Sequence, residues 1–415
     1  MNPITNITNR EFDRQRDTLN LIASENYPSP AVLALLGSVW QNKYAEGYPG
    51  KRYYAGNANS DELETMVQQL ALQVFDTTGE YGVNVQVLSG SPANATVFLS
   101  ALDPGDTVMS LDLAGGGHLS HLHPTSAYLK YYQLINYGVS ATELGYEVDL
   151  TDFKQKLAQH KPKLVIIGFS AYPSQYKFDE LIKAAHDGGA LVLADIAHIA
   201  GLVASGHHDS PFRTGAAGAD YVTMTTHKTL RGPRGAMLFA KTDLMKQVNA
   251  TVFPGTSGGP HLHQIAAIGQ SLLEVTGAAA YPDNQPFEAY IKAVLANTLA
   301  LEAGLNVGGL EIVTKTSTHL TLVKLPDDVD SFVLQQKLEG LGLITNRNQI
   351  PHDLKTPWRP SGLRLGTAAL TSRGLQADDA TAIGRLIAGI VTAKTSDEDA
   401  TAAVKNLLAK LKWYY

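Results

Sequence analysis

The sequence of 415 residues contains no cysteine, which excludes disulfide bonds, thiolate catalysis and cysteine-ligated zinc. It has no apolar run long enough to span a bilayer, and its first residues lack a secretion-signal pattern. It also lacks a basic tract. It has 33 basic and 39 acidic residues, so its net charge is negative. This charge argues against nucleic acid or an anionic membrane as a partner. We therefore expect a cytoplasmic protein.

What the chain has in quantity is apolar material, since 44% of its residues are hydrophobic and only 17% are charged. Its length exceeds that of one ordinary core, so two domains are expected. Strand-like runs near residues 108, 164, 191 and 220 alternate with helical stretches, which is typical of an α/β fold with a mainly parallel, doubly wound sheet. We expect an N-terminal arm (1–20), a large domain (21–280) and a smaller C-terminal α+β domain (281–415).

Several element boundaries follow from local chemistry. Ser60 is a good N-cap ahead of an amphipathic helix. The valines at 83, 85 and 87 alternate as in a strand. Ser91 should cap a further helix, with Pro92 at its first position. An amphipathic helix is expected over 397–415.

Lys228 follows a strand-like run at 221–224 and precedes the turn 232–235. Open α/β sheets bind ligands at such strand ends. A partly desolvated lysine there loses pKa and can form an imine with a carbonyl compound. Taken alone, Lys228 is more readily explained as a surface lysine after a strand.

Asp195 ends the apolar run 190–194, in the next strand of the predicted sheet. A carboxylate beside the ring nitrogen of pyridoxal phosphate keeps that nitrogen protonated. Asp195 could also cap a helix. Together, Asp195 and Lys228 would hold opposite sides of one ring.

The turn Ser89–Asn94 leads into an apolar helix, and glycine, free backbone N–H groups and serine hydroxyls there favour phosphate. Any capped strand–turn–helix looks similar, so the signal is weak alone. The loop 43–54 holds four tyrosines among glycines and prolines without a helical or strand period. Such a loop is expected to be buried against a ligand or a second subunit, the alternative being a purely structural role.

His118, His121 and His123 have spacings that invite a metal hypothesis, but no carboxylate accompanies them, so no metal is expected. A ring-stacking role for one histidine is favoured. Arg364 lies in a strand-like, apolar stretch. It either extends its charged group to solvent or binds a carboxylate, and the sequence does not decide between these.

From about residue 21 to residue 374 the chain resembles the serine hydroxymethyltransferase family. The likeness is densest in LIASENY, NKYAEGYPGKRYY, SGSPAN, GGHLSH, GFSAY, DIAHIAGLVA, TMTTHKTLRGPRG and SGLRLGT. The resemblance implies a pyridoxal-phosphate enzyme of the aspartate-aminotransferase-like fold, working as a dimer or a pair of dimers with shared active sites. It implies transfer of the serine hydroxymethyl group to tetrahydrofolate, giving glycine and 5,10-methylenetetrahydrofolate.

Matched residue by residue, the resemblance implies that Lys228 holds the cofactor covalently and Asp195 pairs with its ring nitrogen. His118 would stack on the ring, and His198 would hydrogen-bond its oxygen. The remaining implied cofactor-binding residues are Ser89, Gly90, Ser91, Ser170, Thr225 and Arg234, with Tyr44, Gly258 and Gly259 contributed across the interface.

For the substrate, the resemblance implies that Arg364 binds the carboxylate, with Ser24 and His198 beside it. Glu46 would handle the proton of the substrate hydroxyl, and Glu46, Tyr44 and Tyr54 would act in the site of the other subunit. Thr225 and His227, beside Lys228, complete the implied catalytic set. The implied folate-binding residues are Leu113, Gly117, His118, Leu119, Asn348, Lys355, Thr356 and Pro357, with Phe253 from the neighbouring subunit.

The chain departs from the family pattern at Gly115, Leu122, Ala55 and Thr256–Ser257, and the likeness is thin over 124–147. These departures fall on the folate side. They leave open a folate-independent aldolase or transaldolase acting on β-hydroxy amino acids such as threonine. A catalytically silent relative would be expected to lack Lys228, Asp195 or Arg364, and all three are present.

Overall fold

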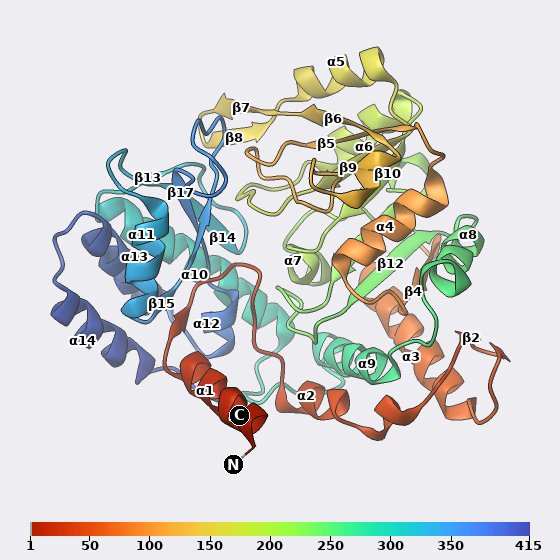
Figure 1. Cartoon of the computed structure of the whole chain (residues 1–415), viewed down its shortest axis with the longest axis horizontal. Helices are drawn as coiled ribbons and strands as arrows, with labels where there is room; N and C mark the ends of the chain where they lie inside the picture. The colour runs from red at the N-terminus through yellow and green to blue at the C-terminus, as the bar shows by residue number, and fades with distance from the viewer. Residues whose placement is uncertain (1) are drawn as a thin grey trace.

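A computed structural model describes residues 2–415, and a seven-stranded sheet lies at the centre of its larger half (Figure 1). In spatial order its strands are β4 (Tyr81–Asn84), β12 (Ala236–Lys241), β11 (Tyr221–Thr225), β10 (Leu191–Asp195), β9 (Leu164–Gly168), β5 (Thr107–Leu111) and β6 (Gln133–Tyr137). Strand β12 is antiparallel to both its neighbours, and the pairs from β11 to β6 are all parallel. The predicted mainly parallel sheet is confirmed.

Helices cover both faces of this sheet, as expected of a doubly wound fold. They are α3 (Ala58–Phe75), α4 (Gly90–Ala101), α5 (Leu150–His160), α6 (Phe178–Asp187), α7 (Ala200–Ala204), α8 (Met245–Ala250) and α9 (Leu262–Thr276). Phe98 of α4 and Val248 of α8 belong to one apolar cluster. Val67 of α3, Phe153 of α5 and Ile268 of α9 belong to another. Strands β9, β10 and β12, buried between the two clusters, are accordingly nearly continuous apolar runs.

The C-terminal part contains a four-stranded antiparallel sheet of the order β13 (Glu311–Ile312), β14 (Leu320–Lys324), β17 (Gly362–Gly366) and β16 (Asn346–Asn348). Its helices are α10 (Phe287–Val307), α11 (Ser331–Gly340), α12 (Ala368–Ser372), α13 (Ala377–Val391) and α14 (Asp397–Leu408). They enclose a separate apolar cluster, rich in leucine and isoleucine.

The N-terminal segment is integrated into this C-terminal part. After α1 (Pro3–Arg16), strand β1 (Leu19–Asn20) pairs in parallel with β15 (Leu343–Ile344). Leu19 and Leu21 lie in the C-terminal apolar cluster. Helix α2 (Pro30–Leu36) then packs against α9. The short elements left are β2 (Gly47–Tyr48), β3 (Lys51–Arg52), β7 (Val139–Thr142), β8 (Gly145–Val148) and the short helical segments Val39–Asn42, Ala127–Lys130, Gly215–Ala217 and Thr251–Thr256.

Four predicted boundaries are wrong. Helix α3 begins at Ala58, so Ser60 is a buried residue inside it rather than its cap. Helix α4 begins at Gly90 after an extended Ser89, which places Ser91 inside the helix and Pro92 at its third position. That position also needs no donor, because the first four N–H groups of a helix are unpaired.

The other two errors concern element ends. Strand β4 ends at Asn84, although Val85 and Val87 are buried. The alternating valines are buried, but Val85 and Val87 do not pair with a neighbouring strand. Helix α14 ends at Leu408, short of the predicted end at residue 415.

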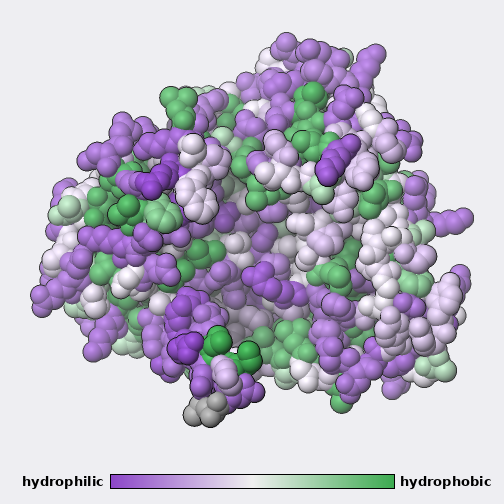
Figure 2. Space-filling model, in the orientation of Figure 1, coloured by the Kyte–Doolittle hydropathy of each residue, from purple (hydrophilic) through white to green (hydrophobic). Residues whose placement is uncertain are grey.

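No helix within residues 2–415 combines the length and apolar character needed to cross a bilayer. The face shown in Figure 2 is largely hydrophilic, with apolar residues scattered over it, and a recess lies between the two sheets.

Candidate active site

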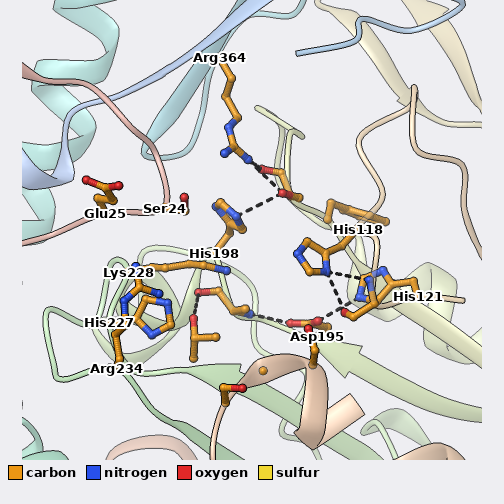
Figure 3. Close-up of a pocket in the computed structure, with 18 residues that line it drawn as sticks. Ser24, Glu25, His118, His121, Asp195, His198, His227, Lys228, Arg234 and Arg364 are labelled. Atoms are coloured by element: carbon orange, nitrogen blue, oxygen red, sulfur yellow. Dashed lines mark hydrogen bonds and ion pairs between the residues drawn. The ribbon is translucent and has the colours of Figure 1, made fainter. Parts of the chain in front are cut away.

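A cavity of about 360 Å³ lies where the parallel strands β9, β10 and β11 end, between the start of α4 and strand β17. Its lining residues include Ser24, Glu25, Ser89, Gly90, Ser91, His118, Phe169, Ser170, Asp195, His198, Thr225, His227, Lys228, Arg234 and Arg364. The structure thus brings together in one chain most of the residues predicted to bind cofactor and amino acid. We call this space the central cavity (Figure 3).

Lys228 is buried at the wall of the central cavity and its side chain extends into it (Figure 3). Burial lowers the pKa of its ammonium group to about 8, and Arg364 and Arg234 act in the same direction while Asp195 opposes them. Roughly a tenth of the amine is therefore in the neutral, nucleophilic form at pH 7, far more than for an ordinary lysine.

Asp195 lies on the cavity floor. Its Oδ2 accepts from Asn94 Nδ2 at 2.8 Å and is 2.9 Å from His121 Nε2, and its Oδ1 accepts from the N–H of Ala197 at 3.0 Å. Burial alone would raise the pKa of this carboxyl, but His121 and Asn94 together hold it well below its usual value. Asp195 is therefore an ionised carboxylate that can pair with a protonated ring nitrogen.

His118 lies above this floor, with its ring 5.6 Å from that of His121 and its Nδ1 2.7 Å from Ser120 Oγ. Burial lowers the pKa of His118 to about 4, so the ring is neutral at neutral pH and suited to stacking. Among residues 2–415 no three His, Cys, Asp or Glu side chains form a metal-binding group. His121 instead contacts Asp195.

The start of α4 forms an anion-binding turn. Ser89 is extended and Gly90 and Ser91 open the helix, so their N–H groups have no helical acceptor. A Cβ on Gly90 would lie 2.9 Å from Thr225 Cγ2, which explains why a glycine stands there. Arg234 lines the same cavity. This donor set fits a phosphate group.

Arg364 points from β17 into the cavity. Its Nη1 donates to Ser170 O at 2.8 Å and Ser170 Oγ at 2.9 Å, and its Nε donates to Asn346 Oδ1 at 3.2 Å. Burial lowers its pKa to about 10, so it remains charged at neutral pH. Only 8% of the residue is exposed. Of the two possibilities left open by the sequence, the geometry excludes a solvent-directed guanidinium and fits a carboxylate receptor.

His198 lies between Arg364 and Lys228 (Figure 3). Its Nε2 is 3.4 Å from Ser170 Oγ, and its Nδ1 is 3.2 Å from His319 Nε2. Burial lowers the pKa of His198 well below its usual value and that of His319 to about 3. Both rings are therefore neutral, and one of the two facing nitrogens donates a hydrogen bond to the other. His227 also lines the cavity, and burial lowers its pKa to about 3.

The residues predicted to act in a second subunit do not line the central cavity. Together with Tyr53, for which no role was predicted, they form a separate group that we call the aromatic loop cluster: Tyr44, Glu46, Tyr53, Tyr54, Phe253, Gly258 and Gly259. The Tyr44 hydroxyl lies 3.3 Å from Glu46 Oε1, and its ring is 5.0 Å from that of Tyr54. A Cβ on Gly259 would lie 3.1 Å from the Tyr44 ring.

The predicted folate residues are dispersed, and of them only His118 lines the central cavity. Leu113, Gly117 and Leu119 lie in the loop after β5, and Asn348 ends β16. Lys355, Thr356 and Pro357 lie on an exposed loop between β16 and β17.

Four contacting residues were not assigned from the sequence: Asn94, His121, His319 and Asn346. Asn94 links Asp195 to β11, because its Oδ1 accepts from Thr223 Oγ1 at 2.6 Å. Asn94 ends the SGSPAN stretch, so its position beside the predicted phosphate turn could have been predicted from the sequence. His319 and Asn346 come from β14 and β16, so only the tertiary fold places them here.

The central cavity combines a lysine amine of lowered pKa, an ionised carboxylate opposite it, an anion-binding turn and a stacking histidine. This set fits pyridoxal phosphate, whose aldehyde, ring nitrogen and phosphate require those three partners and whose ring needs a flat neighbour.

Comparison with known proteins gives a consistent result. The family model described as serine hydroxymethyltransferase matches residues 2–387. A serine hydroxymethyltransferase of Myxococcus xanthus (strain DK1622) is 41% identical over 411 residues, covering 98% of this chain and 94% of the relative. One from Rhodopirellula baltica is 41% identical over 404 residues (97% and 91% covered), and one from Cyanothece sp. (strain PCC 7425) is 43% identical over 389 residues (93% and 87%).

Proposed function

Since this chain belongs to the serine hydroxymethyltransferase family, we propose that the central cavity is where it binds pyridoxal phosphate and exchanges serine for glycine. The chain is a pyridoxal-phosphate-dependent transferase with tetrahydrofolate as co-substrate. The single observation that carries the assignment to this cavity is Lys228, which is buried with a lowered pKa just beyond the end of β11, the strand next to the one that ends in the ionised Asp195.

When bound, pyridoxal phosphate supplies a cationic ring that accepts the electrons of the breaking bond. Each residue has a separate task around it. Lys228 provides the amine that attaches the cofactor, and Asp195 holds the proton on the ring nitrogen. Ser89, Gly90 and Ser91 bind the phosphate. His118 covers the ring and excludes water from its open face.

Arg364 orients the amino acid by binding its carboxylate with the guanidinium edge that is not used by Ser170 and Asn346. Ser24 lines the cavity on the same side and adds a hydroxyl donor. His198 is oriented by its hydrogen bond with His319 and would hydrogen-bond the ring oxygen of the cofactor. Together these residues would fix the carboxylate and limit the orientations that the amino acid can adopt in the cavity.

We also propose a homodimer in which the aromatic loop cluster of one subunit completes the central cavity of the other. Tyr53 is 75% exposed, and Tyr44 and Tyr54 are about half exposed, although they are large aromatic side chains. A second copy would cover them. In that arrangement Glu46 takes up the serine hydroxyl proton in the site of the other subunit. We further propose a division into an N-terminal arm (1–20), a large domain (21–280) and a small domain (281–415), and a cytoplasmic location.

The assignment of the lysine is tested by borohydride reduction of the cofactor-loaded protein followed by peptide mass spectrometry. The expected result is a single reduced cofactor adduct on Lys228. An adduct on another residue, or none, contradicts the proposed site.

The sharing of sites is tested with two variants that are inactive by themselves, Lys228→Ala and Glu46→Gln. In a mixed dimer, one cavity carries both changes and the other carries neither. Mixing the variants under exchange conditions should therefore restore activity. If Glu46 serves its own cavity, every mixed site stays impaired and no activity returns.

Folate dependence separates the transferase from the aldolase hypothesis. The relatives are named for the transferase, not for an aldolase. Serine cleavage should require tetrahydrofolate. Cleavage of allo-threonine without folate should be slower than serine cleavage with folate. Rapid folate-free cleavage of threonine with weak folate dependence would support the aldolase instead.

A further inference from the structure

The segment Ser24–Pro28 is a thin wall between two cavities. One is the central cavity, and the other, of about 570 Å³, is lined by Asn26, Tyr27 and Pro28. Both are also lined by Ser24, Glu25, His227 and Arg234. With open space on two sides, the position of Ser24 depends on the few residues that anchor this wall.

The first anchor is Asn26. Its Nδ2 donates to the main-chain carbonyl of Lys228 and to the Tyr290 hydroxyl, both at 2.7 Å, and its Oδ1 accepts from Ser372 Oγ at 2.7 Å. This anchor joins the wall to the backbone of the lysine itself.

The second anchor is Tyr27, which is 4% exposed. Its ring meets that of Trp413 edge-on at 5.5 Å and that of Tyr415 at 6.4 Å. The Tyr415 hydroxyl donates to the carbonyl of Pro28, and the Tyr281 hydroxyl donates to that of Tyr27 at 3.0 Å. We call the segment Trp413–Tyr415 the aromatic clasp.

The clasp is itself fixed from behind by Arg373. This buried guanidinium lies 5.0 Å from the Trp413 ring, and it donates to the carbonyls of Lys412 at 3.0 Å and Arg16 at 2.9 Å. Trp413 also packs edge-on against Phe12 of α1 at 5.5 Å, and Figure 1 shows this end of the chain lying at α1. The aromatic clasp is therefore itself fixed in place, so it can hold Tyr27 in a defined position.

We propose that the aromatic clasp is a positioning element of the amino-acid site: it fixes Tyr27 and thereby holds Ser24 where its hydroxyl reaches the substrate carboxylate. The family match ends at residue 387, so membership does not assign a role to this segment. The inference rests on the proposed function of the central cavity, and on Ser24 acting beside Arg364.

The test is Trp413→Ala in the cofactor-loaded protein. Ser24 contributes a hydrogen bond to a charged group in both the ground and transition states, so its displacement should raise the serine KM about tenfold and change kcat less than about twofold. Hydrogen–deuterium exchange of residues 22–28 should accelerate. Trp413→Phe, which keeps an aromatic ring, should restore most of the KM.

Val404→Ala is the matched control. Val404 is buried in α14 and packs into the C-terminal cluster, so this variant loses stability without touching the wall. It should leave both KM and exchange at 22–28 unchanged. Tyr415→Phe, which removes one hydroxyl, gives a milder variant and should raise KM about threefold.

The inference is overturned if Trp413→Ala and Tyr415→Phe both keep the wild-type KM while the Lys228 adduct forms normally. Absence of that adduct in the wild-type protein would instead overturn the proposed function, so the two failures are distinguishable.

Discussion

The central cavity and the aromatic loop cluster are built in opposite ways. The cavity residues follow the ends of buried parallel strands, and their side chains are fixed by hydrogen bonds to one another, as Asp195 is by Asn94 and His121. The cluster residues lie on loops and leave large aromatic faces exposed. In the proposed dimer, the half of the site that binds cofactor and amino acid is preorganised within one chain, whereas the other half needs the surface of a second subunit.

The largest effect on the preorganised cavity is expected from substitution of Lys228. Lys228→Met should lower activity at least a thousandfold or so, because the attaching amine is lost. The same change should stabilise the cofactor-free protein, since burial lowers the pKa from 10.5 to about 8. The unfolded chain binds more protons between those pH values, so wild-type stability rises with pH across that window.

The stability gain of Lys228→Met should therefore be largest below pH 8, on the order of 1–3 kcal/mol, and vanish near pH 10.5. Chemical denaturation at pH 7 and pH 10 measures it. The control is Lys183→Met, because the Lys183 side chain is 74% exposed and should give no such pH-dependent gain. A less stable Met variant at pH 7 contradicts the account in which burial of the Lys228 ammonium group costs stability.

The second effect in size is expected at Arg364. Arg364→Lys keeps the charge but loses the fork that spans Ser170, Asn346 and a substrate carboxylate. The serine KM should rise about a hundredfold, with cofactor absorbance retained. Arg347→Lys on the neighbouring strand is the control, because Arg347 lies against Phe332 and Trp358 instead. A KM within threefold of wild type would place the carboxylate elsewhere.

A third, smaller effect tests whether the cavity floor acts as one network. Asn94→Ala removes the amide that joins Asp195 to Thr223. The cofactor dissociation constant should rise about tenfold, and unfolding free energy should fall by about 1–3 kcal/mol. Absorbance titration and denaturation measure the two quantities. Ser100→Ala, in the same helix with a local bond to Val97, should change only stability. Unchanged cofactor affinity in Asn94→Ala would show that the hydrogen bonds of Asn94 do not contribute to cofactor binding.

The smallest effect concerns the loop that carries His118. Leu122 stands where the family usually has glycine; it is fully buried but has a left-handed backbone with φ +64°. Either small substitution loses buried contacts, but glycine accepts this φ without strain. Leu122→Gly should therefore be more stable than Leu122→Ala by about 1 kcal/mol, the reverse of the usual helical order. Equal stabilities would mean that the backbone relaxes.

The sequence predicts the cavity better than it predicts its surroundings, for a physical reason. Strand ends are marked by apolar runs that stop at polar residues, as at Asp195 and Lys228, and parallel strands bring those ends to one edge. Arg364 could not be decided from its own strand, because Ser170, which receives its hydrogen bonds, belongs to a distant segment. His319 was missed for the same reason. Helix starts were misplaced at Ser60 and Ser91, because several consecutive residues there can each act as a cap.

The pairing of β1 with β15 has a consequence for how the molecule is made. Residues 19–21, translated among the first, find their neighbours only when the chain is nearly finished. Contacts between such distant segments form slowly, since a large loop must close before they gain anything. The seven-stranded sheet lies within residues 81–241 and can form without later residues, whereas the segment that leads to Ser24 gains its strand partner only after residue 344 is translated. A growing chain therefore stays unable to recognise an amino acid until release from the ribosome is close.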